Sequence, residues 1–394
     1  MLNIFFIGLI SFFTDISTEM VYPLIPLYLT GTFGATPALV GFIEGIAESL
    51  ASLLKVYSGY LTDRFQKKKL TAFSGYAAGV FYKFALIFAG SWTGILGARV
   101  IDRIGKGIRT SPRDVLVSES TDAKNMGKAF GLHKALDMFG AGLGILIIYF
   151  LMKSSGGSYD YRRLFALSMI PAVLGLFMFV FVKEKKPIRD ETRRDPFWKN
   201  INKIDGQLKL YLLVVFLFTL GNSSNAFLIL RAKHAGFDET SVIFLFFIYH
   251  AAAAVLSMPL GKLSDKIGRK NLLVPGYITF ALCYAGFAFA DTRIALLAVF
   301  ALYGVYTAMI TGVERAFVAE IAPPQLKGTM LGLHSTVAGI ALLPASVIAG
   351  QLWNAFGAAV PFLFGAGLSL LSASLLIVFM KGRKTASISS RNTE

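Results

Sequence analysis

Cysteine and charged residues are scarce in this chain of 394 residues. There is one cysteine, Cys283, and only 16% of the residues are charged. A single cysteine excludes a disulfide framework and a thiol-based metal site. The low charge excludes an ordinary soluble domain, in which about a quarter of the residues are charged.

Signatures of catalysis are also missing. The sequence contains no Gly-x-x-x-x-Gly-Lys-Ser/Thr loop for nucleotide phosphates, and no recognisable set of nucleophile, base and oxyanion donors. We therefore expect that the protein is not an enzyme, and we expect no catalytic residue, no cofactor and no metal site.

Apolar residues are abundant, at 55% of the chain, with a mean hydropathy of +0.62. Crossing a hydrocarbon core of roughly 30 Å takes about 20 apolar residues. The apolar stretches with their short loops use the whole chain, so we predict an all-α integral membrane protein with twelve transmembrane helices. They cover residues 5–28, 38–61, 71–90, 92–112, 127–151, 163–182, 210–230, 240–260, 271–290, 293–314, 329–351 and 358–380.

One segment, residues 183–209, is dense in charges of both signs and separates the sixth helix from the seventh. This composition is typical of a linker. We therefore divide the chain into an N-terminal six-helix bundle (1–183), a cytoplasmic linker (184–208) and a C-terminal six-helix bundle (209–394).

The basic residues lie mostly on one side of the predicted membrane. Loops on the side of the termini hold 27 of the 39 Lys and Arg residues, and the opposite loops hold six. The positive-inside rule then predicts cytoplasmic termini in the cell's inner (plasma) membrane. It accounts for the net charge of +16 without a nucleic-acid partner. The short loops offer no obvious oligomerisation surface, so we expect a monomer.

The two halves of the chain repeat each other at an offset of about 201 residues. Residues 59–68 read Gly-Tyr-Leu-Thr-Asp-Arg-Phe-Gln-Lys-Lys, and residues 261–270 read Gly-Lys-Leu-Ser-Asp-Lys-Ile-Gly-Arg-Lys. The same offset relates Glu119 to Glu320. Parallel repeats of this kind are typical of transporters that hold their substrate between the two halves, near the bilayer midplane.

These repeated loops resemble the signature of the major facilitator superfamily, Gly-x-Leu-x-Asp-Arg-x-Gly-Arg/Lys-Arg/Lys. The first copy differs at Gln66 and the second at Lys266. The run from Arg99 to Gly107 resembles a second element of the family, with Asp102-Arg103 in place of the usual Gln-Gly pair. The resemblance covers the full chain and implies secondary transport through a cavity lined by helices one, four, seven and ten.

The repeated loops also suggest a latch. A carboxylate at a helix end, followed by basic residues, accepts hydrogen bonds from arginines and from a neighbouring helix N-terminus. The resemblance implies that this latch holds the cytoplasmic side closed; the alternative is that the loops only set membrane topology. The candidate gate residues are Gly59, Asp63, Arg64, Gly261, Asp265 and Arg269.

Ionisable residues within the predicted spans lie mainly in the first half. An unpaired charge at the bilayer centre costs at least about 2.5–3.5 kcal/mol, so these groups should face the bundle interior or a cavity. Similar depth predicts that Asp15 pairs with Arg103. Lys83 lies on a helix expected at the lipid-facing periphery, where it either snorkels or pairs with a neighbour. The set either handles substrate and protons or forms structural ion pairs. The candidate substrate or proton-coupling residues are Asp15, Glu19, Glu44, Glu48, Arg99, Asp102, Arg103, Lys106, Asp137, Asn222, Asn225 and Glu314.

Two histidines, His133 and His334, occupy equivalent positions of the two halves. One per half is unlike a metal site, whose ligands cluster, so we expect a gating or packing role.

These features predict a secondary transporter that works by alternating access, exporting a small organic molecule or drug in exchange for protons. Two alternatives stay open. One is proton-coupled uptake of an anionic nutrient or metal chelate, with Arg99, Arg103 and Lys106 as the anion clamp, and the other is a lipid or glycolipid flippase.

Overall fold

The computed structural model describes residues 2–65, 67–122, 125–157, 159–184, 206–322 and 327–380, and the regular structure in these ranges is entirely helical, as predicted. Most of the predicted linker, residues 185–205, lies outside the described residues. The helices of the first half are α1 (Leu2–Val21), α2 (Leu24–Phe33), α3 (Pro37–Phe65), α4 (Lys68–Phe88), α5 (Trp92–Glu119), α6 (Met126–Ser154) and α7 (Tyr161–Met178), which continues as a 3-10 turn (Phe179–Phe181). Those of the second half are α8 (Gly206–Gly221), α9 (Ala226–His234), α10 (Glu239–Ile267), α11 (Arg269–Phe289), α12 (Arg293–Ile310), α13 (Val313–Ile321), α14 (Lys327–Phe356) and α15 (Val360–Phe379).

These helices form rods long enough to cross a membrane. In the described residues, 11 rods are also apolar enough to do so, when α1 with α2, α8 with α9, and α12 with α13 are each taken as one rod. The remaining rod is α5, whose 28 residues include several charged side chains. The chain is therefore a multi-pass membrane protein whose fourth rod carries polar groups into the bundle.

Three rods are interrupted where the sequence disfavours a helix. Pro23 follows the end of α1, and an Asn-Ser-Ser-Asn run at residues 222–225 separates α8 from α9. Between α12 and α13, Gly312 has φ +87°, which an L side chain rarely adopts. The first two breaks lie at corresponding places in the two halves, whereas α5, the counterpart of α12 and α13, is continuous.

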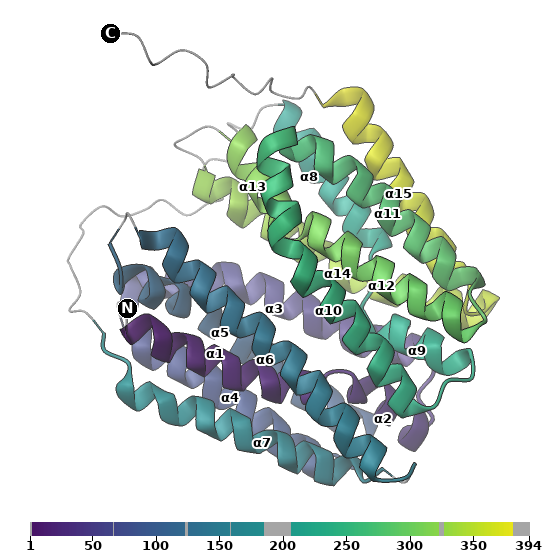
Figure 1. The fold of residues 1–394 in the computed structure, drawn as a ribbon, viewed down its shortest axis with the longest axis horizontal. Helices are drawn as coiled ribbons and strands as arrows, with labels where there is room; N and C mark the ends of the chain where they lie inside the picture. Colours follow the sequence, from purple (N-terminus) through teal and green to yellow (C-terminus); the bar gives the residue numbers. More distant parts are fainter. Residues whose placement is uncertain are drawn as a thin grey trace.

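The chain runs back and forth between two ends of the bundle. We call the end that carries Leu2 and Gly206 the linker end, and the end that carries Phe33 and His234 the opposite end (Figure 1). Four helices that start at the opposite end are capped by a side-chain oxygen that accepts a backbone N–H bond, which satisfies a donor of the first turn. The capping residues are Ser91 for α5, Asp160 for α7, Asp238 for α10 and Thr292 for α12.

The two halves meet along α3 with α14 and along α6 with α10. Glycine permits the closest approach: a Cβ at Gly41 would lie 2.2 Å from the carbonyl oxygen of Ser346. At the opposite end, Tyr161 donates a hydrogen bond to Glu239, and the Tyr159 and Thr240 hydroxyls are 2.7 Å apart. The structure therefore holds the halves together at the opposite end.

Candidate functional site

Five charged side chains of the first half form what we call the central charge cluster: Glu44 and Glu48 on α3, and Arg99, Asp102 and Arg103 on α5. Arg99 Nη2 donates to Glu44 Oε2 at 2.5 Å, and both side chains are only 1% exposed. Arg103 Nη1 lies 3.0 Å from Glu48 Oε1. The helical spacing of four places each like-charged pair on one face, so that two carboxylates of α3 meet two guanidinium groups of α5.

Asp102 lies between the two arginines. Its Oδ2 is 3.3 Å from Arg103 Nε and 3.8 Å from Arg99 Nη1. Arg103 is thus paired with Glu48 and Asp102, and the expected pair of Asp15 and Arg103 does not form between these two described residues. The prediction failed because depth along a helix does not fix the direction in which a side chain points.

Lys83 on α4 was expected either to snorkel at the lipid-facing periphery or to pair with a neighbour, and the structure contradicts the first alternative. Its side chain is fully buried, donates to the carbonyl oxygen of Gly79 at 3.1 Å, and lies 5.4 Å from the Tyr82 ring centroid. Lys106, in contrast, is exposed on α5.

Glu19 of α1 lies at the interface of the two halves. Its Oε2 is 3.9 Å from His250 Nε2 of α10, is buried, and has no hydrogen-bond partner among the described residues. A buried carboxylate oxygen without a donor is costly unless it carries a proton or gains a partner in another state. Asp15, one turn closer to the linker end, is half-buried and forms no ion pair in the described part of the chain.

His133 on α6 belongs to a separate polar group near the linker end. Its Nε2 is 2.9 Å from the Ser11 hydroxyl, which is 3.1 Å from the Tyr76 hydroxyl. Its Nδ1 is 3.8 Å from Asp137 Oδ1. Within the described residues, no group of three or more His, Cys, Asp or Glu side chains has the arrangement of a metal site.

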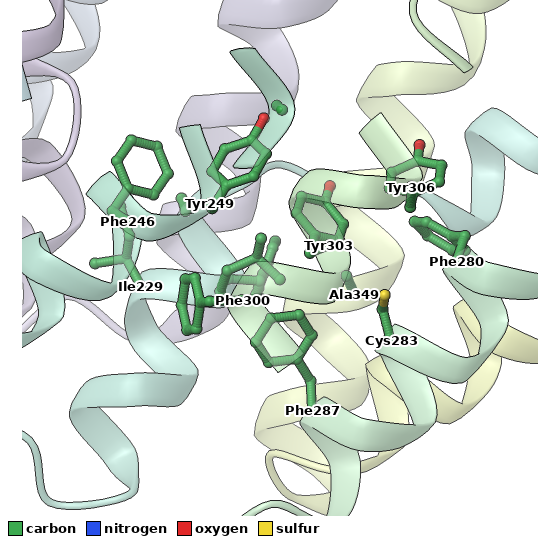
Figure 2. Packing of buried hydrophobic residues seen from close by; sticks show 14 of the residues in the cluster. Ile229, Phe246, Tyr249, Phe280, Cys283, Phe287, Phe300, Tyr303, Tyr306 and Ala349 are labelled. Carbon is green, nitrogen blue, oxygen red and sulfur yellow. The ribbon is translucent and has the colours of Figure 1, made fainter. Parts of the chain in front are cut away.

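In the second half, buried tyrosines and half-buried amides form a cluster that we call the aromatic wall (Tyr249, Tyr284, Tyr303 and Tyr306 with Asn222 and Asn225). Tyr303 donates to Asn225 Oδ1 at 2.9 Å, and Asn222 Nδ2 donates to the Tyr306 hydroxyl at 3.1 Å. Figure 2 shows the hydroxyls of Tyr249, Tyr303 and Tyr306 directed to one side, with Phe287 and Phe300 on the other. The break between α8 and α9 therefore supplies amide partners to the phenols of this buried cluster.

The repeat relates some positions of the wall and its surroundings to charged positions of the first half. The offset of 201 places Arg99 opposite Phe300, Asp102 opposite Tyr303, and Lys83 opposite Tyr284. Tyr284 was not a sequence candidate, although this offset applied to Lys83 would have found it. Equivalent sites thus carry ionic chemistry in one half and aromatic chemistry in the other.

A further polar group lies near the linker end of the second half. Tyr277 of α11 donates to Glu314 Oε1 of α13 at 2.8 Å, and Glu314 Oε2 is 3.9 Å from His334 Nε2 of α14. Glu314 is therefore separate from the aromatic wall, although the sequence placed it in the same candidate set as Asn222 and Asn225.

The repeated loops contain matching contacts. Arg269 lies 3.1 Å from Glu320 Oε2, 3.6 Å from Asp265 Oδ1, and donates to the carbonyl oxygen of Ala316 at 2.8 Å. In the first half Lys68 pairs with Glu119 at the corresponding positions. Gly59, Asp63 and Arg64 lie in the last turns of α3, where the side chains are outside the described part. Gly261 is in α10, and a Cβ there would meet nothing within 4 Å.

Comparison with known proteins identifies the fold. A family model described as the Major Facilitator Superfamily matches residues 7–224 and 210–394. An uncharacterized MFS-type transporter of Methanocaldococcus jannaschii is 36% identical over 385 residues, covering 95% of this chain and 94% of the relative. The multidrug resistance protein MdtH of Photorhabdus laumondii is 22% identical over 345 residues, covering 85% of this chain and 82% of its own.

Solved structures share the same architecture. A mutant of the nucleoside transporter NupG superposes with a TM-score of 0.82 at 12% identity, covering 96% of this chain and 100% of its own. A D-xylose-proton symporter gives a TM-score of 0.75 at 18% identity, covering 96% and 97%. At such low identity these likenesses concern the fold alone.

Proposed function

The chain belongs to the major facilitator superfamily of secondary transporters, and from that membership we propose that it exports a small organic molecule in exchange for protons, by alternating access. Substrate lies between the halves, with the aromatic wall on one side and Glu19 on the other. The central charge cluster holds α3 and α5 together. It also places two guanidinium groups in the same half as Glu19.

The observation that carries proton coupling is the contact of Glu19 with His250. These residues belong to different halves, and Glu19 Oε2 has no hydrogen-bond partner in the described part of the structure. Alternating access moves the halves relative to each other, so the environment of the carboxylate must change during the cycle. A carboxylate whose neighbours change with conformation changes its affinity for a proton, which is what coupling requires.

The aromatic wall supports a substrate with an aromatic or otherwise flat apolar part and a few polar groups. Tyrosine and asparagine supply large contact surfaces with hydrogen-bonding ends. His250 adds a ring that lies 4.3 Å from that of Tyr249, centroid to centroid.

Uptake of an anion is less well supported. The proposed clamp needs free guanidinium groups, but Arg99 and Arg103 are already bound to Glu44, Glu48 and Asp102. Export agrees with the name of the MdtH relative, a multidrug resistance protein.

A flippase needs a polar path open to lipid. The outward groove on α1, α6 and α7, of about 350 Å³, is lined wholly by apolar side chains such as Phe13, Ile147 and Leu174, so it offers nothing to a lipid headgroup.

We also propose that the linker end faces the cytoplasm, because most of the basic residues belong to it. In this orientation, the gate formed by the Asp265–Arg269 segment and by its counterpart at Asp63 closes the cytoplasmic side. The protein works as a monomer of two bundles joined by the linker.

The test has two stages. A panel of ethidium, nucleosides and pentoses is screened for thermal stabilisation of the purified protein, since binding to the folded state raises apparent stability. A stabilising compound is then followed in proteoliposomes with an imposed pH gradient. We expect wild type to accumulate it, and Glu19→Gln to fall to the level seen without a gradient while still exchanging the compound downhill.

The matched control is Asp122→Asn, which removes an exposed carboxylate that forms no ion pair among the described residues. It should transport like wild type. Accumulation by Glu19→Gln at the wild-type level would exclude proton coupling through Glu19.

A further inference from the structure

A second acidic group lies in the other half of the molecule from the central charge cluster. Glu314 is on the short helix α13, Tyr277 on α11 and His334 on α14, close to the linker end. The Tyr277 hydroxyl donates a hydrogen bond to Glu314 Oε1 at 2.8 Å, and Glu314 Oε2 lies 3.9 Å from His334 Nε2.

His334 is buried without a hydrogen bond. Its side chain is 8% exposed, and neither Nδ1 nor Nε2 has a partner among the described residues. Its ring is stacked with Tyr211 of α8 at 6.4 Å between centroids. A buried imidazole always has at least one N–H to place, so this arrangement is incomplete unless the ring gains a partner. Glu314 Oε2, 3.9 Å from Nε2, is an acceptor that could provide it.

The equivalent histidine of the first half differs. His133 Nε2 is 2.9 Å from the Ser11 hydroxyl, which provides the partner that His334 lacks. The offset of 201 places Glu314 opposite Arg113, so the acid beside His334 comes from another helix, whereas the acid beside His133 is Asp137 on its own helix α6. Both histidines thus have a carboxylate close to 4 Å away, but only His133 has a hydrogen-bond partner among the described residues.

The backbone also sets Glu314 apart. The rod is broken at Thr311 and Gly312, with φ +87° at Gly312, whereas α5 runs unbroken through the corresponding positions. Glu314 is thus on a short helix of its own, in the first turn of α13, and it approaches His334 without requiring α12 to move.

We propose that Glu314 and His334 form a second proton-binding site, separate from Glu19. One proton passes from a hydronium ion at the linker end, which becomes water as its O–H bond breaks, to Glu314 Oε2 or to His334 Nε2, where one O–H or N–H bond forms. The added hydrogen then forms a hydrogen bond between Glu314 Oε2 and His334 Nε2, as the distance between these atoms falls from 3.9 Å to hydrogen-bond length. Tyr277 keeps its bond to Oε1 throughout, and no other reactant takes part.

The groups around the pair are mostly neutral. Tyr211 on α8, Tyr277 on α11 and Tyr306 on α12 are phenols, and Arg315 on α13 is the described cation whose charge acts on both Glu314 and His334. The charge of Arg315 also acts on Lys55 of α3. The side chain of Lys327 on α14 is outside the described part.

The experiment uses the full chain, purified in detergent, with nitrogen-15 in its four histidine rings. His334→Gln assigns the His334 signal, which is followed from about pH 5 to 8, where histidines ordinarily change charge. We expect Glu314→Gln to move the His334 midpoint by more than about one pH unit, the mark of coupled groups. Glu19→Gln should move the His250 signal and leave His334 unchanged.

If Glu314→Gln does not fold, Tyr277→Phe removes only the hydroxyl beside the carboxylate and should also shift the His334 midpoint. The proposal is overturned if the His334 signal is identical in wild type and in both variants. It is also overturned if Glu19→Gln moves the His334 midpoint as much as Glu314→Gln does. The same holds if sodium chloride, added at fixed pH, changes the His334 signal in the way that acid does. None of these readings requires transport, so they are independent of the function proposed for Glu19.

Discussion

The pair of Arg99 and Glu44 shows what burial does to a single contact. Both side chains are 1% exposed, and Glu44 Oε2 is also 3.4 Å from the Ser224 hydroxyl of the other half. Removing one partner of a buried pair leaves a charge without compensation, whereas replacing both by apolar groups is often neutral. The contribution of each group therefore depends on the presence of the other.

We expect Arg99→Leu to lower the free energy of unfolding by about 3–5 kcal/mol, since it strands the Glu44 carboxylate. The double variant Glu44→Leu with Arg99→Leu should lose much less than the sum of the two single variants. Denaturant unfolding of the purified protein measures this cycle, with Arg113→Leu, which breaks a more exposed pair with Asp114, as the control. Additive single effects would mean that the two groups do not depend on each other.

Asp238 is a residue outside the spans whose effect depends on pH. It caps α10: Oδ2 accepts from the Ser241 backbone N–H at 3.1 Å, and Oδ1 from the Ser241 hydroxyl at 2.5 Å. The hydrogen bond from the Ser241 side chain holds the pKa of Asp238 below its ordinary value. The cap therefore stabilises the fold above the pKa of the unfolded chain and is lost as pH falls through the folded pKa.

For this cap, we expect Asp238→Ala to lower stability by about 1 kcal/mol near neutral pH. The difference from wild type should shrink as the pH is lowered into the acid range, because protonation removes the same acceptor. Thermal unfolding as a function of pH measures it, and an unchanged difference at low pH would contradict the cap.

At the scale of elements, α3 and α14 are joined by close backbone packing. A Cβ at Gly41 would lie 2.2 Å from the Ser346 carbonyl oxygen, and one at Gly350 would lie 2.7 Å from Ala38 Cα. Both contacts belong to the part of the interface toward the opposite end. Because neighbouring backbone cannot yield as a flexible side chain does, these glycines control how tightly that end closes.

We expect Gly41→Ala to push α3 and α14 apart and so disfavour closure at the opposite end. Spin labels at Thr36→Cys and Asn354→Cys, both exposed, would report a longer distance, and the native Cys283 is buried away from the label. Gly142→Ala on α6 is the control, since its Cβ would meet nothing within 4 Å. Identical distances in both variants would show that Gly41 does not limit closure.

At the scale of the whole molecule, two halves of the same architecture carry different chemistry. The first half holds buried ion pairs, and the second holds phenols and amides at the matching positions, as Asp102 and Tyr303 illustrate. In the proposed function, Glu19 of the first half binds the proton and the aromatic wall of the second half binds substrate, and the Glu19 variants test this division.

The sequence by itself determined the rods, their repeat and the faces that charged residues share. Apolar length and helical period are local properties. The spans, and the fact that the two α3 carboxylates share one helix face, therefore follow from counting residues. It also placed charge in α5, whose polar groups had to turn inward.

Only the tertiary structure decided which groups meet. The partner of Arg103, the burial of Lys83 and the contact between Glu19 and His250 depend on how each rod is rotated about its axis and packed against rods distant in sequence. Helical periodicity fixes neighbours on one rod but leaves that rotation free. It is set by the sum of many side-chain contacts across the bundle, and no single stretch of sequence contains them.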